Sequence, residues 1–171
     1  MGNDGIKDTQ TVAADGRMLR ELIDGVHLHE MQNIITRNGT TTEVVRRDWD
    51  IGRLAINHMI HVTLRAHAIS AWHSHHLQTD RIFVTDGTLR IVLFDDREGS
   101  PTKGKLDVLH LGRMRPATLL IPPFVWHGIQ NLENQASSFV NFFDRAYCYE
   151  NPDEWRLPTD TDAIPYRFAR G

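Results

Sequence analysis

The sequence predicts an all-β domain in which short antiparallel strands pack as a sandwich or barrel. Short runs rich in Val, Ile, Leu, Phe and Thr alternate with turn signals made of Gly, Asp, Asn and Pro. The chain has 171 residues, of which 40% are hydrophobic, so it is long enough for one well-buried core. We therefore expect a single domain over 1–171, with an arm at 1–25, a barrel at 26–145 and a tail at 146–171 that packs on the barrel.

One short helix is expected before the strands begin. Met18, Leu19, Leu22 and Ile23 recur at helical spacing, which predicts a helix over 16–24. After this segment, hydrophobic and polar residues alternate along the chain, which predicts strands from there on. The expected strands are 27–36, 41–47, 56–65, 68–75, 81–85, 89–94, 106–111, 117–121, 127–131 and 137–144.

Charge and composition exclude several classes of partner. The formal net charge of -3 provides no basic surface for nucleic acid or anionic membranes, and no apolar run approaches the length of a membrane span. Cys148 is the only cysteine, and the polar N-terminal residues lack the apolar core of a signal peptide. We therefore expect a cytoplasmic protein that binds neither nucleic acid nor membrane.

Histidines and one carboxylate gather in the segment WHSHHLQTD. Side chains two apart in a strand share a face, so His73 and His75 should point the same way, and Asp80 should begin the next strand. His127 follows a proline turn in IPPFVWHGIQN. Three imidazoles and a carboxylate suit a divalent ion such as Fe, Mn, Co, Ni or Zn, with one or two positions open. The alternative is a hydrogen-bonded polar patch in which Asp80 pairs with Arg81 or another cation.

The spacing of these residues resembles the two motifs of the cupin superfamily. The pattern is H-x-H, four residues, an acid, six residues and Gly, followed later by proline and histidine. The resemblance implies a double-stranded β-helix (jelly-roll) barrel and assigns the metal ligands to His73, His75, Asp80 and His127. Two positions depart from the motif, because the acid is Asp rather than Glu and Phe124 stands where the motif has glycine.

A narrower resemblance is carried by DDREGSPTKG at residues 95–104. This segment is similar to D-x-R-x-x-S-P-T-x-G of the dTDP-4-dehydrorhamnose 3,5-epimerase family, and the order of segments agrees over about 68–166. In that family a histidine, supported by an Asp, removes a proton next to a ketone, while a Tyr donates a proton and a Lys stabilises the enolate. The resemblance places the catalytic base at His73 and implies a small-molecule substrate such as a nucleotide sugar.

The other family roles are not filled by the expected residue types. The lysine position falls on Asp80, the tyrosine position on Asn141, and the phosphate-binding arginine position on Ser70. The chain also ends before the family's C-terminal Asp segment. Loss of the lysine together with gain of His75 would install a metal in place of the ammonium, since a divalent cation can also stabilise an enolate.

A few further residues are assigned from their positions alone. Gln78, Asn141 and Tyr147 are expected to line the substrate pocket, whereas Asp95 and Arg97 are expected to form a structural pair in the turn.

The function expected from these observations is an isomerase or epimerase that moves a proton next to a carbonyl of a sugar or related small polar molecule. Two alternatives stay open: a metal-dependent dioxygenase or decarboxylase, and a cupin that binds a small ligand without turnover. A homodimer is also expected, because related epimerases pair through N-terminal strands and the 27–36 strand would otherwise be an exposed edge.

Overall fold

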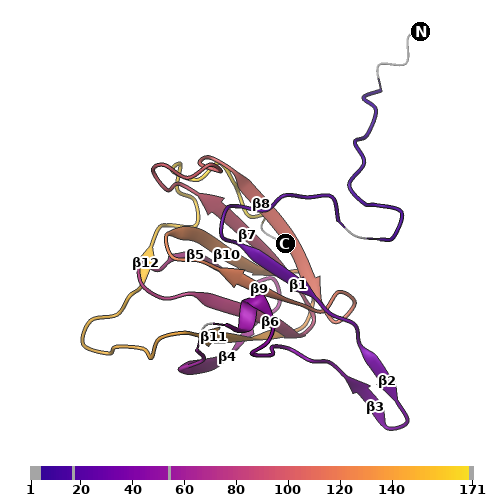
Figure 1. Ribbon diagram of the computed structural model, residues 1–171. Coiled ribbons are helices and arrows are strands. Elements are labelled where there is room, and N and C mark those ends of the chain that lie inside the picture. The colour runs from indigo at the N-terminus through magenta and orange to yellow at the C-terminus, as the bar shows by residue number, and fades with distance from the viewer. Residues whose placement is uncertain (1–4, 17, 54, 170–171) are drawn as a thin grey trace.

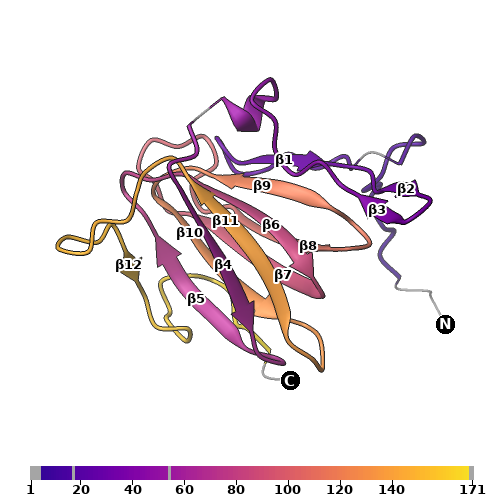
Figure 2. The same ribbon diagram turned by 90° about the horizontal axis from the view of Figure 1, so that it is seen from below.

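Two five-stranded antiparallel sheets pack face to face in the computed structural model, which describes residues 5–16, 18–53 and 55–169 (Figures 1 and 2). The first sheet consists, in spatial order, of β1 (His27–Glu30), β9 (Ala117–Ile121), β6 (Asp80–Asp86), β11 (Ser137–Phe143) and β4 (His58–Leu64). The second sheet consists of β12 (Trp155–Arg156), β5 (Ile69–Ser74), β10 (Val125–Asn131), β7 (Thr88–Asp95) and β8 (Leu106–Gly112). The predicted all-β jelly roll is confirmed.

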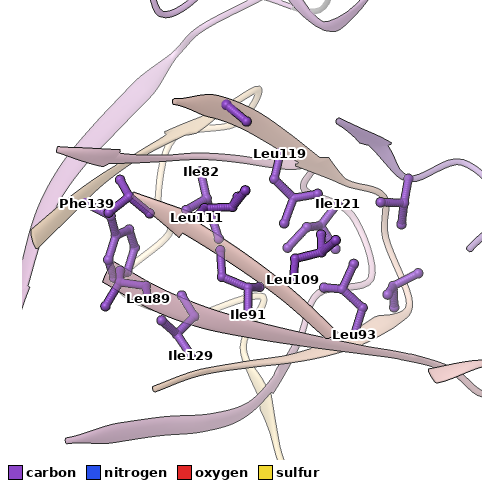
Figure 3. Close-up of a cluster of buried hydrophobic side chains, with 14 of the residues drawn as sticks. Ile82, Leu89, Ile91, Leu93, Leu109, Leu111, Leu119, Ile121, Ile129 and Phe139 are labelled. Atoms are coloured by element: carbon purple, nitrogen blue, oxygen red, sulfur yellow. The ribbon is translucent and has the colours of Figure 1, made fainter. Parts of the chain in front are cut away.

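The main core lies between the two sheets (Figure 3). Alternate residues of β7, namely Leu89, Ile91 and Leu93, point inward and meet Ile82 of β6 and Leu119 of β9. This spacing of two follows from strand geometry, in which successive side chains point to opposite faces. The interior is therefore filled by aliphatic side chains along most of its length.

A second apolar cluster covers the outer face of the second sheet. Trp72 of β5 is fully buried there and packs with Val92 and Phe94 of β7 and with Ile164 of the C-terminal segment. The backbone N–H of Trp72 donates a hydrogen bond to the carbonyl of Leu157, and the short strand β12 extends the sheet beyond β5. The C-terminal segment is thus fastened to β5 by both main-chain pairing and side-chain packing.

The predicted strand 27–36 is divided in the structure. β1 ends at Glu30, and β2 (Ile34–Thr36) pairs instead with β3 (Gly39–Thr41) in a hairpin that projects from the barrel in Figures 1 and 2. Arg37 and Asn38 form its two-residue turn, as the Arg-Asn-Gly signal predicts. The strand expected over 41–47 is wrong, since residues 42–46 carry no strand pairing.

The helix predicted over 16–24 is wrong for the described residues of that range. Met18 forms an isolated bridge with Val12, and Ile23 enters the core while its N–H donates a hydrogen bond to the Asp107 carboxylate. So short a segment gains little from helix formation in isolation, and contacts to β8 replace the helical hydrogen bonds. The described residues contain only one short 3₁₀ helix, η1 (Asp50–Gly52), and no helix that is long and apolar enough to cross a membrane.

The turn at 95–104 that follows β7 and contains the Ser-Pro-Thr residues is organised around the buried carboxylate of Asp95. Arg97 donates hydrogen bonds to both oxygens at 2.8 and 2.9 Å, and the hydroxyls of Ser100 and Thr102 donate at 2.6 Å each. Arg97 also donates to the carbonyl of Asp24, so the turn holds the N-terminal arm against the barrel. The predicted structural pair of Asp95 and Arg97 is confirmed.

Hydrogen bonding makes Asp95 strongly acidic. Burial alone would raise its pKa, but the hydrogen bonds from Arg97, Ser100 and Thr102 outweigh burial and hold the pKa well below its usual range. A carboxyl group whose pKa is lower in the folded than in the unfolded state stabilises the fold above its unfolded pKa of about 4. That contribution is lost as the pH falls from there toward the folded pKa.

Asp95→Asn should therefore lower the free energy of unfolding by about 2–3 kcal/mol at pH 7, because the amide cannot accept both charged hydrogen bonds. The difference between wild type and variant, measured by urea unfolding, should narrow as the pH falls below about 4. Asp162→Asn, which removes an exposed partner of Arg167, is the matched control and should change stability little. A difference that is equally large at pH 7 and pH 3 would contradict this assignment.

Candidate functional site

Three strands place the polar residues of the predicted site at one end of the barrel. β5 carries His73 and leads directly into His75, β6 begins at Asp80, and β10 carries His127. His73 and His127 are opposite each other in the antiparallel register of β5 and β10. His75, Asp80 and His127 each offer a ligand atom, all three within 4.8 Å of one another, and all three residues are buried.

The distances within this group match those between ligands of a shared ion and also those of long N–H···O contacts. The Nε2 atoms of His75 and His127 lie 3.4 and 3.3 Å from the same oxygen, Oδ2 of Asp80. Charge-assisted N–H···O hydrogen bonds are shorter, at about 2.7–2.9 Å. Ligand atoms bound to one metal at about 2.0–2.2 Å lie about 2.8–3.6 Å apart in octahedral or tetrahedral geometry.

Backbone carbonyls fix the orientation of both imidazoles. Nδ1 of His75 lies 2.5 Å from the carbonyl oxygen of Asp153, and Nδ1 of His127 lies 3.2 Å from that of Val125. A carbonyl only accepts, so each Nδ1 carries the hydrogen and each Nε2 faces Asp80. A hydrogen bond from the second ring nitrogen to a carbonyl is the usual support of a metal-binding histidine. The residues therefore fit a divalent ion held by two imidazoles and one carboxylate.

Without an ion, the buried charges stabilise one another. Burial alone would raise the pKa of Asp80, but His127 and His75 outweigh it and hold the pKa well below its usual range. Burial alone would lower the pKa of His75, yet Asp80 and the Asp153 carbonyl raise it to about 9. Gln78 donates from Nε2 to Oδ1 of Asp80 at 3.1 Å, so each carboxylate oxygen is occupied. The carboxylate is ionised at neutral pH.

His73, the fourth predicted ligand, lies beside this group with partners of its own. Its Nε2 is 2.9 Å from the hydroxyl of Ser70, its Nδ1 is 3.6 Å from the Glu154 carboxylate, and its ring stacks on that of His127. Burial lowers the pKa of His73, although Glu154 opposes this effect. The structure thus assembles three of the four predicted ligands and pairs the fourth with a carboxylate.

Two neighbouring acids that the sequence analysis did not assign complete the site. The pairing of β12 with β5 sets Arg156 opposite His73, which brings Glu154 to the His73 ring. The Asp153 carboxylate accepts hydrogen bonds from the backbone N–H groups of residues 76, 77 and 78, so it closes the turn that carries His75. The visible signal was the acid pair in NPDEW, but only the strand pairing places it at the histidines.

The predicted pocket residues differ in their surroundings. Gln78 contacts Asp80 and also lines a cavity of about 460 Å³, together with Tyr147 and Asp153. Asn141 is buried, and its side-chain oxygen accepts a hydrogen bond from the backbone N–H of Arg81. Gln78 and Tyr147 are therefore near open space, whereas Asn141 is engaged with the sheet.

Known proteins resemble most of this chain. A family model for dTDP-4-dehydrorhamnose 3,5-epimerase matches residues 22–166. The probable low-salt glycan biosynthesis epimerase Agl13 of Haloferax volcanii is 33% identical over 139 residues, covering 81% of this chain and 89% of that protein. The spore coat polysaccharide biosynthesis protein SpsL of Bacillus subtilis is 32% identical over 150 residues, covering 86% of this chain and 97% of that protein.

A solved structure shows the same architecture. The dTDP sugar isomerase of Desulfovibrio desulfuricans superposes with a TM-score of 0.77 at 28% identity, covering 84% of this chain and 90% of that chain. The resemblance expected from the SPT segment is therefore confirmed over nearly the full barrel. The chain belongs to the dTDP-4-dehydrorhamnose 3,5-epimerase family of carbohydrate epimerases.

Proposed function

We propose that this protein epimerises a dTDP-linked keto sugar by moving a proton at a carbon next to the ketone. The observation that carries the proposal is the pairing of His73 with Glu154. This pair lies beside the buried group of His75, Asp80 and His127. The relatives support the substrate class, since their names describe epimerases and a dTDP sugar isomerase.

The surroundings of His73 suit a general base. The Glu154 carboxylate favours the tautomer with hydrogen on Nδ1, which leaves the lone pair on Nε2, where Ser70 now donates. Burial keeps the ring neutral and able to accept a proton. Once Nε2 has taken the proton, Glu154 stabilises the positive ring.

The enolate formed by proton removal needs positive charge near its oxygen. At the position of the family's lysine this chain has Asp80, whose negative charge would oppose enolate formation. We propose that His75, Asp80 and His127 hold a divalent ion (Fe, Mn, Co, Ni or Zn), with His73 outside the ligand set. When bound, such an ion supplies Lewis-acid stabilisation of a developing oxyanion. Gln78 and the two backbone carbonyls keep the three ligands in place.

The donor set also supports a second candidate. Two histidines and one carboxylate are the ligands of many non-haem Fe(II) oxygenases, which keep open positions for substrate and O₂. O₂ consumption that depends on the keto sugar would identify such an enzyme. Family membership favours the epimerase, which consumes no O₂.

A homodimer remains part of the proposal. β1 lies at the edge of its sheet, and the adjacent β2–β3 hairpin exposes 56% of Ile34 and 86% of Ile35. An exposed edge with apolar side chains is a template for pairing with another strand. Sedimentation at micromolar concentration should therefore give the mass of two chains.

His73→Asn and Glu154→Gln test the base. With a dTDP-linked 4-keto-6-deoxyhexose in D₂O, His73→Asn should slow deuterium uptake next to the ketone by about 10²–10⁴-fold, because it removes the proton acceptor. Glu154→Gln should slow it by about 10-fold or more through kcat, since the positive ring loses its partner. Proton NMR of the sugar measures the exchange.

Glu150→Gln, the same change at an exposed residue, is the control for Glu154→Gln and should exchange at the wild-type rate. Retention of more than about a tenth of the wild-type exchange in His73→Asn would remove His73 from the role of base.

Elemental analysis tests the metal site. Protein purified without a histidine tag should contain close to one divalent ion per chain, and His75→Ala or His127→Ala should lose it, because each removes one of three protein ligands. His76→Ala is the matched control, since this neighbouring histidine stacks on Phe124 and Trp155 outside the group. Less than about 0.2 ion per chain after incubation with Fe, Mn, Co, Ni and Zn would contradict the metal proposal. The exchange rates of His73→Asn and Glu154→Gln would still decide whether His73 is the base.

A further inference from the structure

We propose that the outer face of the second sheet carries a binding site for an uncharged pyranose sugar, separate from the epimerase site. The site is a groove of about 480 Å³, called here the outer groove. Its lining includes Ser74, His76, Asp96, Glu98, Phe124 and Trp126. This proposal does not rest on the proposed function.

Strand geometry separates the outer groove from the epimerase site. On β5, Ser74 faces the groove while His73 faces the barrel, and on β10 Trp126 and His127 divide in the same way. His76 follows the same alternation, since its neighbour His75 belongs to the barrel group. The two sites therefore lie back to back across one sheet and cannot share a small ligand.

The rings of His76 and Phe124 lie in the lining of the outer groove, and Trp155 packs on the other face of His76. The His76 ring stacks between Phe124 and Trp155, with centroid distances of 4.5 and 4.2 Å and interplanar angles of 28° and 12°. Phe124 is 48% exposed and Trp155 is 51% exposed. Flat aromatic faces carry partial negative charge, which suits the C–H edges of a pyranose ring.

The backbone of Phe124 is held in a conformation that favours glycine. Its φ is +66°, in the left-handed region that bulky side chains rarely occupy, and the cupin motif has glycine at this position. The Phe124 N–H donates a hydrogen bond to the carbonyl of His75, which fixes the turn. Backbone strain of this kind clusters at binding and active sites, and here the strained turn carries the Phe124 ring in the lining of the groove.

Charge decides between a sugar and a nucleotide. The groove contains the carboxylates of Asp96 and Glu98, and Glu98 is paired with Lys103. The Arg97 guanidinium, the cation of the lining, is engaged by Asp95 and by the carbonyl of Asp24. A diphosphate would be repelled by this balance, whereas sugar hydroxyls can donate to the carboxylate of Asp96.

Saturation-transfer NMR with methyl α-L-rhamnopyranoside and methyl α-D-glucopyranoside tests the site. We expect transfer to the ring C–H protons of at least one glycoside at millimolar concentration. Trp155→Ala and Phe124→Gly should each reduce the transfer at least 5-fold, and Asp96→Asn should weaken binding. Tyr149→Ala, which removes an exposed aromatic ring elsewhere, should leave the transfer unchanged.

Three results would overturn the proposal. The first is absence of transfer from both glycosides in folded wild-type protein. The second is equal transfer in the folded Trp155→Ala and Phe124→Gly variants. The third is conversion of a dimer to a monomer by Trp155→Ala in sedimentation, which would make the groove an interface between copies of the chain.

Discussion

The burial of the Asp80 carboxylate is the constraint on which the rest of the site depends. A buried charge is tolerated only when it is neutralised and hydrogen-bonded. His75, whose pKa is raised to about 9, meets the first requirement at one oxygen, and Gln78 meets the second at the other oxygen. The backbone carbonyls of Asp153 and Val125 hold the two imidazoles around the carboxylate.

The C-terminal segment helps to hold the side chains that surround Asp80. His75 is oriented by the carbonyl of Asp153, and the carboxylate of Asp153 in turn closes the 76–78 turn. The next residue, Glu154, reaches His73, and β12 then pairs with β5. One short segment therefore supports both His73 and the buried group, although it lies about 80 residues from His73 and His75 in the chain.

Much of the barrel could be predicted because strand alternation is local. The strand at 117–121 agrees with β9 at both ends, and the Arg-Asn-Gly turn lies where expected. The helix over 16–24 could not be excluded locally, since its apolar spacing serves instead to bring Ile23 into the core beside Asp107. Contacts between distant segments overrode the local pattern there.

The sequence indicated which residues gather around Asp80, but not which partners each of them contacts. H-x-H spacing places His73 and His75 on one face, but it says nothing about partners. Glu154 and Ser70 draw His73 away from Asp80, and both contacts depend on the pairing of β12 and the course of β5. The exchange of lysine for Asp80 was visible in the sequence, whereas its surroundings required the folded barrel.

The central claim is that proton transfer at His73 depends on a divalent ion held by His75, Asp80 and His127. The most direct measurement is solvent deuterium exchange into a dTDP-linked 4-keto-6-deoxyhexose by chelator-treated protein whose fold is intact. The account predicts that the exchange rate falls by about 10²-fold or more when the ion is removed. The rate should recover when one equivalent of the divalent ion per chain is added back. Exchange at the untreated rate in metal-free protein would contradict it.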